Sequence, residues 1–391
     1  MEHNHLGALI LTTLGIFIVP FLSPFLKIPV AVGELLYGVF LGFIFSLLGW
    51  SKDLEHILGF LSFLGFSLLM FLAGLEIDWN RIETLRRKEK AVIFAVVLTN
   101  FIIALLVCHF LHLPLTEVMI LGALGIGLML SVLRELNLDA RFSQTILIAG
   151  SLGEVATLSL LTFYDLYLSF GLGNSFIFHT LLIGLFALAF MLLLKLIKFL
   201  VWLYPQKFAY LVEGENKAAI DIRASFALML AFMGISTLVH IEPILGAFIA
   251  GTLVGFIFRD KHSLESKLTS LGYGFLIPFF FIQVGMQFDI TSLGNWTFLK
   301  LAMVLLVSLF LVKVFSSLWF LLLGFSFREI LLAGALFSFP FTVLIAVGKI
   351  LFEKGIWQAS DFTVVVILTL LSSLVYPLLA KFLAQKSPSK E

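Results

Sequence analysis

Two ionisable side chains stand inside long apolar segments of the sequence. Glu154 lies twelve residues into the segment 143–170, and Lys313 lies seventeen residues into the segment 297–323. A charged side chain at the centre of a membrane helix costs roughly 2.5–3.5 kcal/mol on insertion scales, so a residue kept there usually has a function. The alternative is structural, because the two side chains could form a buried ion pair that only holds two halves of the protein together.

The neighbours of Glu154 give its helix one polar face. Ser151 and Thr157 lie three residues before and after it, and therefore on the same side of a helix. A carboxylate away from water must be neutralised by a proton or by a small cation, and each excludes the other. This competition is the chemistry of a cation/proton exchanger. We therefore predict an ion- and proton-binding group of Glu154, Ser151 and Thr157. Lys313, if close, would stabilise the ionised carboxylate and offset the negative ends of nearby helices.

Three further polar residues are candidates for a supporting role. Asp165 follows Glu154 by eleven residues, which at 3.6 residues per turn is the same helical face about 16 Å further along. It could line an outer funnel, or it could simply be a solvated helix end. Glu34 and Gln283 also lie near membrane depth and are candidates for contacts around the binding group.

The composition places these residues in a membrane protein. Of the 391 residues, 61% are hydrophobic and 13% charged, with a mean hydropathy of +1.11 and 44 phenylalanines, so the solvent must be lipid. The net charge of +1 gives no basic face for nucleic acid, and we expect no nucleic-acid partner. The single cysteine, Cys108, excludes a disulfide framework within one chain. Enzyme motifs are lacking, and we expect no cofactor and no catalysis.

Apolar windows of about 20 residues predict an all-α protein with about thirteen transmembrane helices. The first seven windows lie near 6–24, 29–49, 55–77, 90–112, 115–135, 143–170 and 175–202, and six more lie near 217–240, 243–258, 268–288, 297–323, 327–352 and 357–383. With the N-terminus outside, 20 of the 25 lysines and arginines fall on the cytoplasmic side. We therefore predict a multi-pass protein of the cell membrane with a cytoplasmic C-terminus.

The sequence also contains an internal repeat. Residues 33–43 and 246–256 share the pattern G-x4-G-x3-G-F at an offset of 213, and residues 74–78 and 285–289 share G-[LM]-[EQ]-[IF]-D at an offset of 211. Seven helices separate the partners, and because seven is odd the halves must run in opposite directions through the membrane. The alternative is chance similarity between glycine-rich helices. The predicted organisation is a first repeat over 1–174, a connector over 175–216 and a second repeat over 217–391, with no soluble domain.

The repeat predicts where two helices should break. Gly122, Gly125 and Gly127 lie at the centre of the window 115–135, and the matching region of the second half contains Pro340. Glycine and proline both weaken a helix interior, so paired breaks at matching positions mark the expected substrate site. Packing glycines and a plain proline kink are the alternative. Ser338 and Thr342 flank the second break and could supply the oxygen ligands that hard cations prefer.

Four stretches of the sequence resemble the monovalent cation:proton antiporter family, which includes Kef-type potassium efflux transporters and bacterial sodium/proton exchangers. The stretches are 29–36 with Gly38 and Gly42, 69–78, 245–251 and 278–286. The resemblance implies thirteen helices, a core domain with two crossed broken helices, a dimerisation domain, a homodimer and elevator-like exchange. It also implies an acidic pair on the sixth helix, which falls here on Gly153 and Glu154, and a lysine on the eleventh helix, which falls on Lys313.

The sequence departs from that family at both breaks. The Ser-Thr usual at the first break is Gly125-Ile126 here, and the Arg-Gly-Glu common on the twelfth helix is replaced around residues 339–341. The nucleotide-binding domain of Kef-type proteins does not occur in this sequence, so no regulation by such a domain is inferred.

The resulting hypothesis is secondary transport of Na⁺ or K⁺ against protons, with alternating access at Glu154. A single carboxylate suggests one proton per cation. Two other functions stay open: an ion-coupled symporter of an organic solute, which would need a larger polar pocket beside the breaks, and a membrane sensor with the same fold and no transport.

Overall fold

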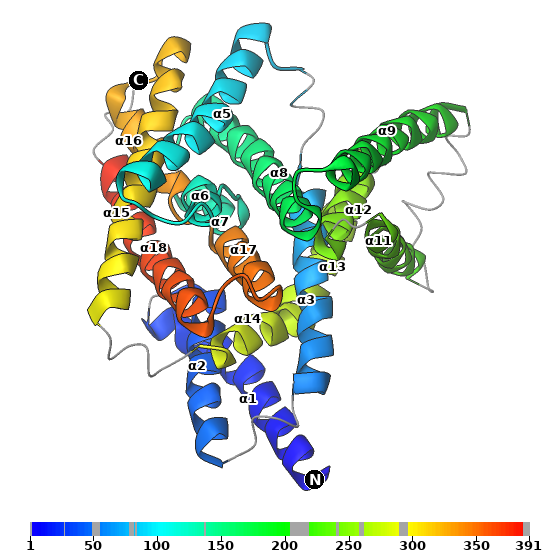
Figure 1. The fold of residues 1–391 in the computed structure, drawn as a ribbon, viewed down its shortest axis with the longest axis vertical. Helices are drawn as coiled ribbons and strands as arrows, with labels where there is room; N and C mark the ends of the chain where they lie inside the picture. Colours follow the sequence, from blue (N-terminus) through cyan, green and yellow to red (C-terminus); the bar gives the residue numbers. More distant parts are fainter. Residues whose placement is uncertain are drawn as a thin grey trace. The chain divides into compact units, whose positions relative to one another are not determined.

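The computed structural model describes residues 2–26, 28–48, 55–77, 82, 84–136, 138–203, 219–239, 242–257, 262–288 and 296–385. Within these residues every regular element is helical (Figure 1). The helices are α1 (Glu2–Leu26), α2 (Val30–Leu48), α3 (Glu55–Leu75), α5 (Arg87–Phe110), α6 (Glu117–Gly122), α7 (Gly127–Glu135), α8 (Ala140–Phe170), α9 (Asn174–Leu203), α11 (Ile220–Leu238), α12 (Pro243–Ile257), α13 (His262–Leu271), the π-helix η1 (Gly272–Leu276), α14 (Ile277–Met286), α15 (Trp296–Ser317), the 3₁₀-helix η3 (Leu318–Leu323), α16 (Phe327–Phe337), α17 (Phe341–Glu353) and α18 (Ala359–Gln385).

The helices confirm the predicted class of polytopic, all-α membrane protein. Among the described residues, nine helices are long and apolar enough to cross a bilayer, and α16 and α17, bent by 42° at their break, pass the same test as a pair. Shorter apolar stretches lie at Glu117–Met129, which runs from α6 across the break into α7, at Asn174–Leu185 in α9 and at Pro243–Phe256 in α12. Each of the thirteen predicted windows falls on one of these helices or on consecutive helices. The number of spans itself stays a prediction.

One predicted boundary differs clearly from the structure. The window 268–288 is a composite of α13, η1 and α14, and its helix begins at His262. The polar sequence of α13, HSLESKLTSL, explains the difference, because an apolar window cannot register a helix that carries few apolar residues.

Both predicted helix breaks are present. Residues 123–126 separate α6 from α7, and residues 338–340 separate α16 from α17. Pro340 has no N–H, and the backbone turns sharply there, with the Phe341 N–H bonded to the Phe339 carbonyl at 2.7 Å.

Glycines at repeat-related positions make equivalent contacts. A Cβ on Gly38 would lie 2.1 Å from the Ile282 carbonyl oxygen, and a Cβ on Gly251 would lie 1.8 Å from the Phe71 carbonyl oxygen. Gly38 and Gly251 are 213 residues apart, and Phe71 and Ile282 are 211 apart, which are the offsets found in the sequence. Only glycine permits such close approach of two helix backbones. Both repeats therefore have a glycine at the helix crossing, α2 with α14 in one case and α12 with α3 in the other.

The chain divides into two compact units. Unit 1 comprises residues 1–52, 81–160 and 281–391, and unit 2 comprises residues 53–80 and 161–280. Unit 1 contains both broken helices. Its centre is α17, in which every residue from Phe341 to Leu351 is buried, with α6 and α7 packed against it (Figure 1). Each unit draws on both predicted repeats, so the division into 1–174, 175–216 and 217–391 describes the sequence repeat and stays a prediction.

Candidate functional site

The carboxyl group of Glu154 lies against the unwound segment of the first break. Glu154 is 1% exposed, and its Oε2 accepts a hydrogen bond from the Ile126 N–H at 3.3 Å. Thr157, one turn further along α8, accepts the Leu124 N–H at 3.3 Å and donates to the Gly153 carbonyl at 2.8 Å. An unwound segment leaves backbone N–H groups without acceptors in a helix. Here the side chains of Glu154 and Thr157 on α8 are the acceptors.

The two breaks contact each other at the crossing point of their helices. A Cβ on Gly125 would lie 2.8 Å from Val343 Cγ2 and 3.4 Å from Pro340 Cβ. A Cβ on Gly127 would lie 3.4 Å from the Thr342 hydroxyl oxygen, and Thr342 is itself 7% exposed. The Thr342 methyl carbon lies at the same distance, so this side chain contacts the start of α7 with both groups. The predicted break residues Gly125, Gly127, Pro340 and Thr342 are therefore brought together within unit 1.

Lys313 contacts the last turn of α6, directly before the first break. It is fully buried, and its Nζ donates to Asn100 Oδ1 and to the Leu121 carbonyl, both at 2.9 Å. Among the described residues Lys313 makes no ion pair, since both of its acceptors are neutral oxygens. The purely structural alternative, an ion pair between Lys313 and Glu154, is therefore not what these contacts form.

Asn100 is a polar residue of this region that the sequence reasoning missed. It is fully buried on α5, and its Nδ2 donates to the Gly122 carbonyl at 2.6 Å. Two signals could have found it: an amide within the apolar window 90–112, and its position 213 residues before Lys313, which is the repeat offset. Neither signal identifies Leu121 and Gly122 as the acceptors on α6, because that depends on how the helices cross.

The other predicted site residues have more local roles. The Ser151 hydroxyl donates to the Leu147 carbonyl of its own helix at 2.9 Å, and the Ser338 hydroxyl, directly after α16, donates back to the Gly334 carbonyl at 2.6 Å. Glu34 is 2% exposed on α2, and Gln283 is partly buried on α14. Within the described residues neither of these two makes a hydrogen bond to the breaks. Asp165 lies partly buried on the part of α8 that belongs to unit 2.

Gly153, where the family resemblance implies a second acid, packs against Leu124. A Cβ at this position would lie 2.3 Å from Leu124 Cδ1 and 2.6 Å from Leu124 Cβ. Leu124, from the unwound segment, already fills the space that a side chain on Gly153 would need. A second carboxylate at position 153 therefore has no room unless Leu124 moves.

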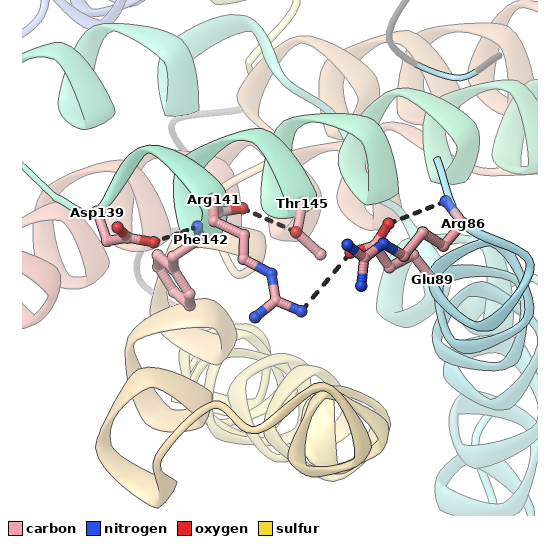
Figure 2. Close-up of polar contacts among 6 residues, drawn as sticks. All are labelled: Arg86, Glu89, Asp139, Arg141, Phe142 and Thr145. Atoms are coloured by element: carbon pink, nitrogen blue, oxygen red, sulfur yellow. Dashed lines mark hydrogen bonds and ion pairs between the residues drawn. The ribbon is translucent and has the colours of Figure 1, made fainter. Parts of the chain in front are cut away.

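The start of α8, the helix that carries Glu154, is fastened by polar contacts (Figure 2). Asp139 Oδ2 accepts the Phe142 N–H at 3.1 Å and so caps the first turn. Arg141 forms a 3.6 Å ion pair with Glu89 of α5, and its guanidinium lies 5.5 Å from the ring centroid of Phe325. Figure 2 shows Glu89 between Arg141 and the Arg86 N–H, which it accepts at 3.0 Å. These contacts join α8 to α5, the helix of Asn100.

Comparison with known proteins gives a family match over nearly the whole chain. The family model described as the transmembrane sodium/hydrogen exchanger matches residues 11–386. The putative Na⁺/H⁺ antiporter YjbQ of Bacillus subtilis is 28% identical across the whole chain, which spans 65% of that longer relative. The Na⁺/H⁺-K⁺ antiporter GerN of Bacillus cereus is 26% identical over 90% of this chain and 89% of its own.

A solved structure supports the fold. The sodium proton antiporter MjNhaP1 from Methanocaldococcus jannaschii superimposes with a TM-score of 0.66 over 98% of both chains at 17% sequence identity. At that identity the likeness concerns the fold alone. The family match over nearly the whole chain, joined to the helices described above, makes this multi-pass membrane protein a member of the sodium/hydrogen exchanger family.

Proposed function

We propose that the protein exchanges a monovalent cation, Na⁺ or K⁺, for protons by alternating access, with Glu154 as the group that binds each in turn. The observation that carries the proposal is the position of Glu154, which is 1% exposed and bonded to the unwound backbone of the first break at Ile126. A carboxylate in such a place needs a positive partner, and a proton and a small cation compete for the same oxygens.

The names of the relatives agree with this chemistry. The relative from B. subtilis is called a putative Na⁺/H⁺ antiporter, and GerN is called a Na⁺/H⁺-K⁺ antiporter. Both sodium and potassium therefore remain candidates for the transported ion of this chain.

The ligands proposed for the cation are oxygens from the two breaks and from α8. Glu154 supplies the charge, and Thr342 places a hydroxyl at the start of α7, beside the crossing of the breaks. The acceptor lone pairs of Ser151, Ser338 and Thr157 extend this set, and hard cations favour such oxygen ligands. With Leu124 in the space beside Gly153, one carboxylate serves the site, so we propose one proton per cation and electroneutral exchange.

The remaining features of the proposal concern the whole molecule. Unit 1 contains both breaks, Glu154 and Lys313, and is proposed as the core that carries the ion between the two sides. We propose an N-terminus outside and a C-terminus in the cytoplasm from the distribution of lysine and arginine. A homodimer stays a prediction from the family resemblance.

Flux measurements in reconstituted vesicles test the function. Sodium or potassium gradients are imposed on vesicles that contain a pH-sensitive dye, with the wild type, Glu154→Gln and Asp165→Asn. Asp165 is the matched control, because it is a carboxylate on the same helix that is only partly buried. We expect Glu154→Gln to fall to the level of protein-free vesicles, while Asp165→Asn retains most of the exchange.

Three outcomes would contradict the proposal. Wild-type exchange in Glu154→Gln would remove the proposed role of that residue. Solute uptake without a pH change would favour the symporter, and absence of any ion-dependent flux in the wild type would favour a sensor.

A further inference from the structure

We infer that Asn100 is a positioning residue for ion exchange, which holds Lys313 against the end of α6 and thereby sets the geometry of the first break. This inference deepens the proposed function and rests on it. It concerns a residue that does not touch the proposed ion ligands and acts through the backbone that Glu154 contacts.

Three hydrogen bonds connect Asn100, Lys313 and the last two residues of α6. Asn100 uses both ends of its amide, accepting from Lys313 at 2.9 Å and donating to the Gly122 carbonyl at 2.6 Å, while Lys313 donates to the Leu121 carbonyl at 2.9 Å. The carbonyls of a last helical turn have no partner within the helix, and burial makes an unpaired one costly. Asn100 and Lys313 together satisfy two of these groups at the point where α6 stops.

The position of the two residues in the repeat supports a specific pairing. Asn100 on α5 and Lys313 on α15 are 213 residues apart, the same offset that relates Gly38 to Gly251. They are therefore corresponding positions of the two halves that meet each other. Two lysines there would repel, and two asparagines would place no cation beside the carbonyl ends of α6. Because one half has asparagine at this position and the other has lysine, the lysine ammonium donates to the asparagine oxygen.

Among the described residues, no such pair of side chains from other helices bonds to the second break. At the end of α16, the Gly334 carbonyl accepts the Ser338 hydroxyl at 2.6 Å, and the Ala335 carbonyl accepts the Ser338 N–H at 3.1 Å. At the end of α6 the next residue also donates, from the Ala123 N–H to the Ile120 carbonyl at 3.2 Å. The Leu121 and Gly122 carbonyls that follow are paired by side chains from α15 and α5, and this is the difference between the two helix ends. A helix end that depends on other helices needs a residue to position it.

The path from Asn100 to the proposed ion site is short. Only residues 123–126 lie between the capped end of α6 and the start of α7, and within them the Leu124 and Ile126 N–H groups bond to Thr157 and Glu154. A shift of the α6 end changes where the Ile126 N–H points, and with it the position of the Glu154 carboxylate. Loss of Asn100 is therefore expected to weaken cation binding without removing the carboxylate that performs the exchange.

The test separates positioning from simple support of the fold. Asn100→Ala, Asn100→Asp and Thr99→Ala are reconstituted, and exchange is measured against cation concentration. We expect Asn100→Ala to raise the half-saturating concentration about tenfold, the effect of losing one hydrogen bond to a charged group. Asn100→Asp keeps an oxygen acceptor for Lys313 but loses the donor to the Gly122 carbonyl, so it is expected to recover only part of the affinity. Thr99→Ala is the matched control, since within the described part of the chain its hydroxyl bonds to Ala95 and Val96 of its own helix and to no other helix.

A double variant covers the case in which single variants fold poorly. Asn100→Leu with Lys313→Met removes the buried ammonium together with its acceptor, so no charge loses its partner, although the Leu121 and Gly122 carbonyls lose their donors. If Asn100 and Lys313 only support the fold, the fraction of this variant that folds will show wild-type half-saturation, and that result would overturn the inference. Wild-type half-saturation in Asn100→Ala would do the same.

Glu154→Gln in the same vesicles keeps the two proposals apart. If Glu154→Gln is inactive while Asn100→Ala resembles the wild type, the positioning role alone fails. If Glu154→Gln exchanges like the wild type, the proposed function fails, whatever the result at Asn100.

Discussion

At both breaks a few unwound residues interrupt a helix, but the groups that bond to the two breaks differ. At the first break, Glu154 and Thr157 bond to the unwound N–H groups, and Asn100 and Lys313 bond to the carbonyl end of α6. At the second break, the bonds come from Ser338 and from the turn at Pro340, and the side chains of Phe337, Phe339 and Phe341 are all buried.

The difference indicates a division of roles between the halves. An inverted repeat requires matching backbone paths, so that two conformations of similar energy exist, and this requirement leaves the side chains free to differ. Here the ionisable and amide side chains lie at the first break. At the second break the carbonyls of α16 bond to Ser338, and buried aromatic side chains stand beside the break. The following predictions test whether the first break depends on other helices and the second does not.

The largest effect on stability is expected from Lys313→Met. The change leaves the Leu121 carbonyl and Asn100 Oδ1 buried without their donor, and each unsatisfied group costs about 1–3 kcal/mol. The midpoint of thermal unfolding in detergent should fall well below that of the wild type. Lys300→Met, an exposed lysine on the same helix, is the control and should change little. Equal midpoints for the two variants would show that the end of α6 does not need its lysine.

A smaller loss is expected from Gly153→Ala. The new methyl group would lie 2.3 Å from Leu124 Cδ1 and 2.6 Å from Leu124 Cβ, and such overpacking costs about 1–3 kcal/mol. Adding Leu124→Ala should recover part of the loss in the same unfolding assay. Gly184→Ala on α9 has open space around it and serves as the control. A wild-type midpoint for Gly153→Ala would mean that Leu124 does not block a second acid.

The smallest effect is expected from Ser338→Ala at the second break. The hydroxyl bonds only to its own helix at Gly334, and such a bond contributes about 0.5–1.5 kcal/mol. Thr157→Val at the first break should cost more, because it leaves the Leu124 N–H buried without an acceptor. Unfolding midpoints of the two variants, measured side by side, check the order. The reverse order would contradict the proposed difference between the breaks.

Some of this architecture could be read from local patterns. The apolar windows, the offsets of 213 and 211 and the glycines and proline of the breaks all reflect composition and spacing along the chain. Glu154 and Lys313 stand out for the same reason, since a charge inside an apolar helix is visible without knowing what surrounds it. The polar helix α13 was not predicted, because its sequence has no continuous run of apolar residues.

Composition and spacing thus predict a membrane-spanning helical chain with a repeat, two breaks and one acid that could bind an ion. The partners of these residues follow from helix packing: Asn100 for Lys313, Ile126 for Glu154, and Leu124 in the space beside Gly153. The physical reason is that these contacts join residues 28 to 213 positions apart, through helices whose crossing depends on side-chain packing along their whole length.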